Sequence, residues 1–239
     1  MLPPATERVW HFLKEQRWLA GFVMVGGSAL ALRIAHRLSE DLDFAFPDLK
    51  LPRARLDALL KNAAEAGFDF QRNDNEAALN EFIQGGGELH DYQQDFVVDG
   101  VVKVSFFAPD SGQARVLGGL QEAGPRLATL PELFKTKALV SAVRSKTRDW
   151  VDLFVMLKEH GFTLCDYEAA FREAGAESQF EAGLARLCSG RPQQDDEGFA
   201  HLLVKPPKVS DMQAYFTGLR DAWEIERARS AKMKEGGEA

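Results

Sequence analysis

One stretch constrains the fold more than any other, residues 22–46, which read FVMVGGSALALRIAHRLSEDLDFAF. A short apolar run ends at Gly26 and Gly27, a segment of helical character follows, and a second short run carries Asp41 and Asp43. This order predicts a strand, a tight turn, a helix and a second strand. Because side chains two residues apart in a strand point to the same face, we expect Asp41 and Asp43 to project together.

The turn and the acid pair each suit a particular chemistry. Glycine tolerates positive φ and lets the backbone approach a ligand, and the N–H groups that open a helix attract anions. Ser28 is expected at the helix start, either as the N-cap or with its hydroxyl directed at a phosphate. Two neighbouring carboxylates repel unless a cation lies between them, and Mg²⁺ commonly joins carboxylates to substrate phosphates. The pattern therefore predicts a site for a metal-bound phosphate.

The string GGSALALRIAHRLSEDLDF resembles the first motif of the polymerase-β-like nucleotidyltransferase superfamily. In its full length it is similar to the AbiEii/AbiGii-type nucleotidyltransferases, which occur among the toxins of bacterial toxin–antitoxin systems. The resemblance implies that the turn Gly26–Ser28 holds a nucleoside triphosphate and that Asp41 and Asp43 hold Mg²⁺ or Mn²⁺. Two interpretations of Arg37 stay open, because it can reach a phosphate or pair with one of the two aspartates.

Composition limits the class of protein. The chain has 239 residues, of which 45% are hydrophobic and 27% charged, and these are ordinary globular values. A net charge of −7 argues against a protein that coats nucleic acid non-specifically. Cys165 and Cys188 lack metal-ligand spacing, which indicates reduced thiols in a cytoplasmic protein. Glu7 and Arg8 interrupt any export signal, and the longest uncharged run, 18–32, is too short to span a membrane.

A β-hairpin is predicted at residues 97–102, VVDGVV, because Asp99-Gly100 supports a two-residue turn between β-branched flanks. Its second strand carries Lys103, which we include among the candidate nucleotide contacts. The predicted cross-strand pairs are Val98 with Val101, Lys103 with Phe96, and Ser105 with Gln94.

Ser105 departs from the superfamily pattern. Such enzymes usually place a third carboxylate here, which helps to hold the metal and can accept the proton of the attacking hydroxyl. In the predicted register Asp91 and Asp95 face away and Asp99 lies in the turn, so the hairpin offers no replacement. Three alternatives stay open: a carboxylate from elsewhere completes the site, the chemistry is weak, or the protein binds nucleotide without transferring it.

The second half of the chain has a cluster of basic residues between positions 133 and 148, a stretch that contains no Asp or Glu. One interpretation is a solvated face or a set of partners for the acids that follow. The other is a clamp for a triphosphate or a nucleic-acid acceptor, because both lysine and arginine bind phosphate. The cluster consists of Lys135, Lys137, Arg144, Lys146 and Arg148.

The string KTKALVSAVRSKTRDWVDLF is similar to a later motif of the same family. That resemblance implies that Lys137 contacts nucleotide phosphates, that Arg148 belongs to the nucleotide site, and that Asp152 is the last functional acid. The competing hypothesis is that Arg148, Asp149 and Asp152 form a structural ion network joining the two halves of the chain.

Together these patterns predict an α/β (α+β) protein. A nucleotidyltransferase-type mixed sheet with flanking helices is expected over residues 1–120 and a helical domain over 121–239, and a capping box at Thr129 and Glu132 is expected to open its first helix. The resemblance implies Mg²⁺-dependent transfer of a nucleoside monophosphate from a nucleoside triphosphate to a hydroxyl of RNA, tRNA or protein, by a toxin with a cognate antitoxin. The alternatives are a degraded fold that serves as a nucleotide-binding or regulatory module, and a structural protein whose carboxylates only form salt bridges.

Overall fold

The first half of the chain is built on a mixed β-sheet, as the sequence predicts. Its described strands are β1 (Val23–Val25), β2 (Leu42–Ala45), β3 (Phe70–Arg72), β4 (Gln93–Val98), β5 (Val102–Phe107) and β6 (Arg126–Leu127). They follow the order β3-β4-β5-β2-β1-β6. β2 pairs antiparallel with β1 and parallel with β5, so the two strands of the predicted motif lie at the centre of the sheet.

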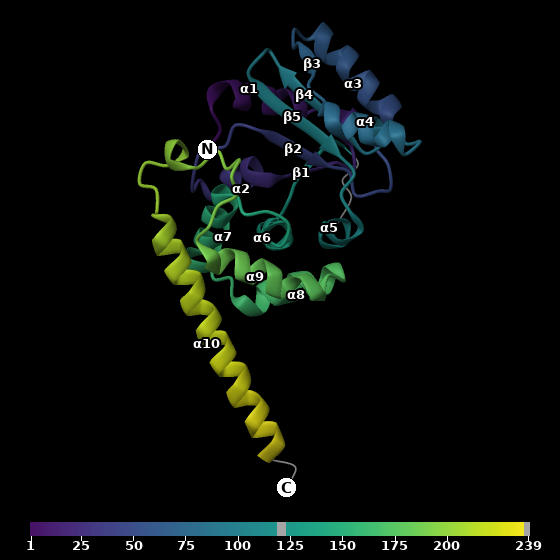
Figure 1. The fold of residues 1–239 in the computed structure, drawn as a ribbon. Helices are drawn as coiled ribbons and strands as arrows, with labels where there is room; N and C mark the ends of the chain where they lie inside the picture. The colour runs from purple at the N-terminus through teal and green to yellow at the C-terminus, as the bar shows by residue number, and fades with distance from the viewer. Residues whose placement is uncertain (119–122, 237–239) are drawn as a thin grey trace. The chain divides into compact units, whose positions relative to one another are not determined.

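The structure is a computed structural model that describes residues 1–118 and 123–236 (Figure 1). The chain divides into two compact units, Met1–Leu133 and Phe134–Ala239. This division falls inside the helix α6 (Leu130–Ser141). The boundary that the sequence suggests after residue 120 lies outside the described residues.

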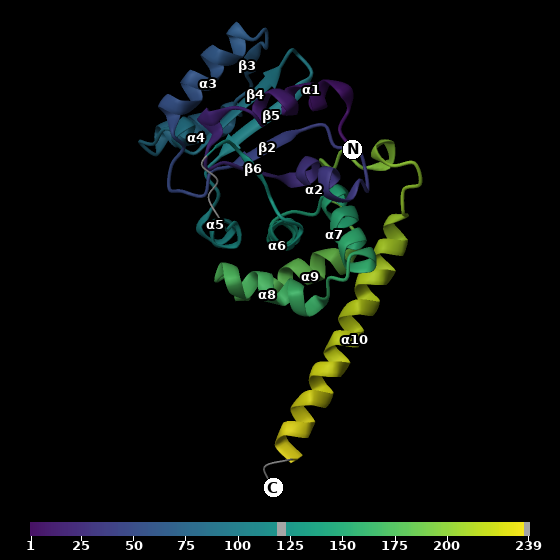
Figure 2. The same ribbon diagram turned by 180° about the vertical axis from the view of Figure 1, so that it is seen from behind.

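Helices of the first unit cover both faces of its sheet. They are α1 (Pro4–Leu13), α2 (Gly26–Ile34), α3 (Arg53–Glu65), α4 (Glu76–Gln84) and α5 (Ser111–Val116), with short 3₁₀ turns at Arg17–Leu19 and Leu89–Asp91. Figures 1 and 2 both show α1 and α3 on one side of the sheet and α2 on the other.

Aromatic rings form the core between the sheet and the first of these helix layers. Phe106 of β5 contacts Phe44 of β2 and Phe96 of β4, with ring centroids 5.4 and 6.1 Å apart. Trp10 of α1 reaches Phe44 at 6.2 Å. Because Leu42 and Phe44 are fully buried here, the residues between them must face the opposite side of the sheet.

The β4–β5 hairpin differs from its prediction by one residue. The turn between Val98 and Val101 does form, with Asp99 at φ +51° and Gly100 at φ +70°. However, Val101 stays outside the ladder and Val98 pairs with Val102, so the loop has three residues.

Because of this one-residue shift, every predicted cross-strand pair is wrong by one residue. Lys103 lies opposite Val97 rather than Phe96, and Ser105 lies opposite Asp95 rather than Gln94. Gln94 turns into the core, where its side chain is 1% exposed. The prediction that Asp95 faces away from Ser105 is therefore wrong.

The second unit is helical, as predicted. Its helices are the remainder of α6, α7 (Thr147–Glu159), α8 (Leu164–Ala174), α9 (Phe180–Ser189) and α10 (Val209–Gly236), with short 3₁₀ turns at Glu177–Gln179 and Ala200–Leu202. α10 packs against α9 and α7. Among the described helices, none has the length and apolar character needed to cross a membrane.

The predicted capping box at the start of α6 is confirmed and extended. The Thr129 hydroxyl accepts a hydrogen bond from the Glu132 N–H at 3.4 Å, and the Glu132 carboxylate accepts one from the Thr129 N–H at 2.7 Å. Arg126 of β6 donates to both oxygens of the same carboxylate, at 2.7 and 2.8 Å. One acid thus joins the edge strand to the helix that follows it.

Candidate active site

Gly26 forms the bend between β1 and α2. Its φ of +74° favours glycine, and a Cβ built at this position would lie 2.4 Å from Oδ2 of Asp43. The Asp43 carboxylate therefore rests directly on the backbone where α2 begins. The predicted closeness of the glycine turn to the acid pair is confirmed for Asp43.

Gly27 gives room to a cation on the same turn. A Cβ at Gly27 would lie 2.5 Å from Nη2 of Arg37 and 2.8 Å from the hydroxyl oxygen of Ser39. Arg37 is 4% exposed, and its Nη1 donates to the carbonyl oxygen of Leu38 at 2.9 Å. The guanidinium thus lies against the first turn of α2, where negative ligands are also favoured by the helix dipole.

Ser28 does not cap the helix. α2 begins at Gly26 with Val25 in the N-cap position, so Ser28 is the third helical residue. Its side chain is fully buried, and its hydroxyl donates to the carbonyl oxygen of Asp41. Ser28 therefore ties the helix through its hydroxyl to the segment that leads into β2. The backbone N–H groups of the first turn, those of Gly26, Gly27 and Ser28, are the groups that the helix start offers to an anion.

Asp43 lies as the alternation predicts, and Asp41 directly precedes β2. Asp41 and Asp43 are half-buried, whereas Leu42 and Phe44 are fully buried. Asp43 pairs with Val25 of β1 on one side and with Ser105 of β5 on the other.

A third carboxylate stands in the same row of the sheet. Ser105 pairs with Asp43 in β2 and with Asp95 in β4, and residues directly opposite in a ladder share a face. The row therefore reads Asp43, Ser105, Asp95. Lys103, two residues before Ser105, is on this face and exposed. The sequence prediction missed Asp95 because it assumed a two-residue hairpin loop. The loop has three residues, and this difference places Asp95 rather than Gln94 opposite Ser105.

The acids on this face suit a metal that needs few protein ligands. Within residues 1–118 and 123–236, groups of three or more histidine, cysteine, aspartate or glutamate side chains placed to hold one metal ion are absent. Mg²⁺ is commonly held by one or two carboxylates together with water and substrate phosphates. The pair Asp41 and Asp43, beside an amide-lined helix start, fits that requirement.

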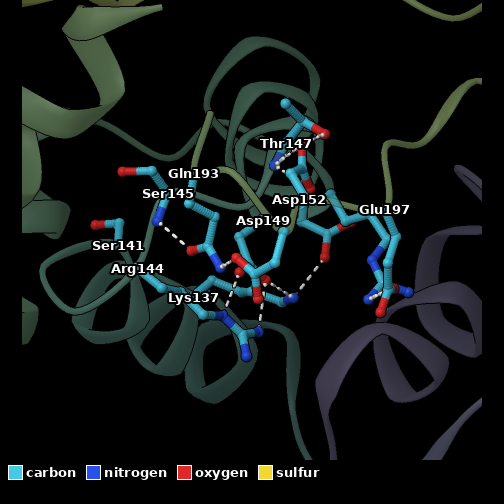
Figure 3. A network of polar contacts seen from close by, with 12 residues as sticks. Lys137, Ser141, Arg144, Ser145, Thr147, Asp149, Asp152, Gln193 and Glu197 are labelled. Carbon is cyan, nitrogen blue, oxygen red and sulfur yellow. Dashed lines mark hydrogen bonds and ion pairs between the residues drawn. The ribbon is translucent and has the colours of Figure 1, made fainter. Parts of the chain in front are cut away.

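The predicted lysine of the later motif lies in a buried ion network of the second unit (Figure 3). The ammonium of Lys137 is 2.6 Å from Oδ1 of Asp149 and 2.7 Å from Oδ2 of Asp152. Arg144 donates through Nε to Oδ2 of Asp149 at 2.8 Å. Burial alone would raise the pKa of Asp149, but Lys137 and Arg144 outweigh it and hold that pKa below its usual value.

Other cations of the cluster also have acidic partners. Arg148 pairs with Glu197 at 2.5 Å, and Lys135 pairs with Glu173 at 2.6 Å. The predicted ion network thus contains Asp149 and Asp152, with Lys137 as their shared cation, while Arg148 has a different partner. These contacts all lie within the second unit.

Comparison with known proteins identifies the family of the chain. Residues 10–236 match the model of the family described as nucleotidyl transferase AbiEii toxin, type IV toxin–antitoxin system. A curated relative, the uncharacterized protein aq_aa25 of Aquifex aeolicus (strain VF5), is 24% identical over 148 residues, which are 62% of this chain. The match spans 63% of the length of that relative.

Two solved structures share the fold. JHP933 from Helicobacter pylori has a TM-score of 0.52 at 15% identity, and the match covers 98% of this chain and all of that one. MenT4, a nucleotidyltransferase toxin from Mycobacterium tuberculosis H37Rv, has a TM-score of 0.50 at 15% identity, covering 89% of this chain and 82% of that one. With the family match over nearly the whole sequence, the chain belongs to the AbiEii nucleotidyltransferase toxin family.

Proposed function

We propose that the protein transfers a nucleoside monophosphate from a nucleoside triphosphate to a hydroxyl group of an acceptor, with pyrophosphate as the leaving group. This proposal is supported by one observation: the Asp43 carboxylate lies against the backbone of Gly26, the first residue of α2, next to the N–H groups of the first helical turn. A carboxylate and a set of helix-start N–H groups side by side suit a polyphosphate accompanied by a divalent cation.

Each residue of the turn has a role in this proposal. Asp41 and Asp43 would hold Mg²⁺ or Mn²⁺, which when bound neutralises phosphate charge and orients the triphosphate. The backbone N–H groups of Gly26, Gly27 and Ser28 would hold phosphate oxygens. Arg37, already packed on this turn, would add positive charge as pyrophosphate leaves.

Three cations outside the turn also have roles in this proposal. Lys103 is exposed on the same sheet face and is available to a phosphate or an acceptor backbone. When nucleotide binds, Lys137 would replace its ion pair with Asp149 or Asp152 by a contact to a phosphate oxygen. Arg148 would replace its ion pair with Glu197 in the same way. Asp152 would then keep the Lys137 ammonium in position.

The proposed acceptor is RNA, with tRNA as the first case to test, and a cognate antitoxin protein is the proposed partner. Membership of a toxin family of a toxin–antitoxin system supports the antitoxin partner, and the RNA acceptor is what the sequence resemblance implies. Expression of the wild-type chain is expected to arrest bacterial growth, and Asp43→Asn is expected to remove that arrest at equal protein level. Equal toxicity of the two proteins would contradict a toxic activity that depends on this site.

The direct experiment incubates the purified protein with the four α-³²P-labelled nucleoside triphosphates, Mg²⁺ and total tRNA. The expected result is labelled RNA and free pyrophosphate from the wild type, and neither product from Asp41→Asn or Asp43→Asn. The matched control is Asp57→Asn, which changes an exposed aspartate on α3. No labelled product from the wild type would overturn the proposal.

Ser105 favours a second candidate function, a module that binds nucleotide without transferring it. A serine neither holds a metal well nor accepts a proton at neutral pH. Saturable binding of Mg²⁺-nucleotide, measured by calorimetry, without product from any acceptor fraction would support the module.

A further inference from the structure

We propose that Asp95 is the proton acceptor for the attacking hydroxyl, in place of the carboxylate that Ser105 lacks. This inference rests on the nucleotidyl transfer proposed above. It follows from the observed register, in which Asp95 of β4 is directly opposite Ser105 and Ser105 is directly opposite Asp43.

The position of Asp95 suits a base better than a metal ligand. Asp43 and Asp95 are separated by two strand spacings, roughly 9.5 Å between Cα atoms. Carboxylates that share one Mg²⁺ each approach it to about 2.1 Å, which this separation does not favour.

The state of the Asp95 carboxylate provides a second, independent observation. Its Oδ2 accepts a hydrogen bond from Nε2 of Gln93 at 2.6 Å. Its Oδ1 is buried and accepts no hydrogen bond from the residues that the structure describes. A buried carboxylate oxygen without a donor is costly, so a turn of the Asp95 side chain that brings Oδ1 to a ligand hydroxyl would break no hydrogen bond at that atom.

The small side chain of Ser105 separates the two acids. A hydroxyl placed above Ser105 has Asp95 on one side and the proposed polyphosphate site at Asp43 on the other. We therefore assign Asp43 on β2 to the nucleotide and its metal, and Asp95 on β4 to the proton of the acceptor hydroxyl. An aspartate at position 105 on β5 would be expected to contribute to both tasks.

The reaction then balances as follows. The acceptor oxygen forms a bond to the α-phosphorus, and its proton passes to the carboxylate of Asp95. The bond between the α-phosphorus and the oxygen that bridges to the β-phosphate breaks, and pyrophosphate leaves with that electron pair. Asp95 returns the proton to solvent after the product departs.

The test compares wild type, Asp95→Asn and the control Asp57→Asn with labelled nucleoside triphosphates, Mg²⁺ and total tRNA across pH 5 to 9. For Asp95→Asn we expect kcat to fall about 10²- to 10⁴-fold. In the wild type, kcat should rise with pH on the acid side of the profile as the base ionises, and this rise should be absent in Asp95→Asn. Calorimetric Kd values for Mg²⁺-nucleotide should change less than about threefold, because Asp95 is not assigned to the nucleotide.

A second variant distinguishes loss of the base from loss of the fold. Asp95→Asn combined with Ser105→Asp returns a carboxylate to β5 and should recover at least tenfold of the lost activity. Wild-type-like kcat and pH profile in Asp95→Asn would overturn this inference and leave the proposed transfer intact. A loss of nucleotide binding in Asp95→Asn with no recovery in the double variant would also overturn it. Absence of transfer by the wild type would overturn both proposals.

Discussion

Oδ2 of Asp43 lies 2.4 Å from the point that a Cβ on Gly26 would occupy, so the carboxylate fills the space of the missing side chain. The acid and the helix start are therefore in direct contact before any ligand arrives. This contact predicts that residue 26 cannot change without moving Asp43.

Gly26→Ala should disrupt the site beyond its effect on the backbone. Positive φ costs an alanine about 1–2 kcal/mol, and the methyl group would in addition displace the Asp43 carboxylate. Gly67→Ala is the matched control, because Gly67 has φ +79° and nothing lies within 4 Å of the point that its Cβ would occupy. We expect similar strain in both variants, but a loss of Mg²⁺-nucleotide binding by calorimetry only in Gly26→Ala. Equal nucleotide affinities would refute the role of this contact.

Lys137→Met should destabilise the second unit. It removes the ammonium from two carboxylates, Asp149 and Asp152, whose side chains are 2% and 0% exposed. Removing one partner of a buried ion group typically costs about 3–5 kcal/mol, because a buried charge is left uncompensated. The measurement is urea unfolding, with the exposed Lys205→Met as control. A change below about 1 kcal/mol would mean that the network contributes little to stability.

Glu132→Gln should weaken the junction between β6 and α6. The substitution removes the charge that Arg126 neutralises and disturbs the bond to the Thr129 N–H. Loss of a mostly buried, charge-assisted set of hydrogen bonds is expected to cost about 2–4 kcal/mol of the free energy of unfolding. Thermal unfolding of Glu132→Gln and of Glu65→Gln, an exposed acid at the end of α3, provides the comparison. Equal Tm values would argue that water replaces the lost contacts.

Acid should destabilise the protein through Asp149 and Glu132. Burial acts to raise the pKa of each carboxyl, but their cationic and hydrogen-bond partners outweigh it and lower both values. A carboxyl whose pKa is lower in the folded state contributes stability above its unfolded pKa, about 4, and loses it as pH falls through the folded value. The free energy of unfolding should therefore be nearly constant from pH 7 to 5 and decline below about pH 4. The decline should be shallower in Glu132→Gln, whereas a parallel decline would remove Glu132 from this account.

The central motif could be predicted because its determinants are local. Two glycines, a helical segment and alternating acids specify a strand, a turn, a helix and a strand without distant information. The burial of Leu42 and Phe44 then directs Asp43, which lies between them, to the other face, as the alternation requires. The role of Ser28 could not be predicted, because its hydrogen bond goes to Asp41, thirteen residues away.

The hairpin shows why the rest of the site is harder to predict. Its turn forms at Asp99-Gly100 as the sequence indicates, but the ladder begins one residue later than a two-residue loop requires. Since side chains alternate with a period of two, one residue decides whether Gln94 or Asp95 faces Ser105. The core decides this, because Phe96 and Val98 are buried at 1% and 0% exposure while Asp95 is not.

Val101 stands outside the ladder and is 71% exposed, so the strands on either side do not depend on it for their alignment. Its removal would leave a two-residue connection with Val98 still facing Val102. Loss of Val101 would thus leave Asp95 opposite Ser105, whereas loss of one residue of β4 between Asp95 and the turn would place Gln94 opposite Ser105 instead.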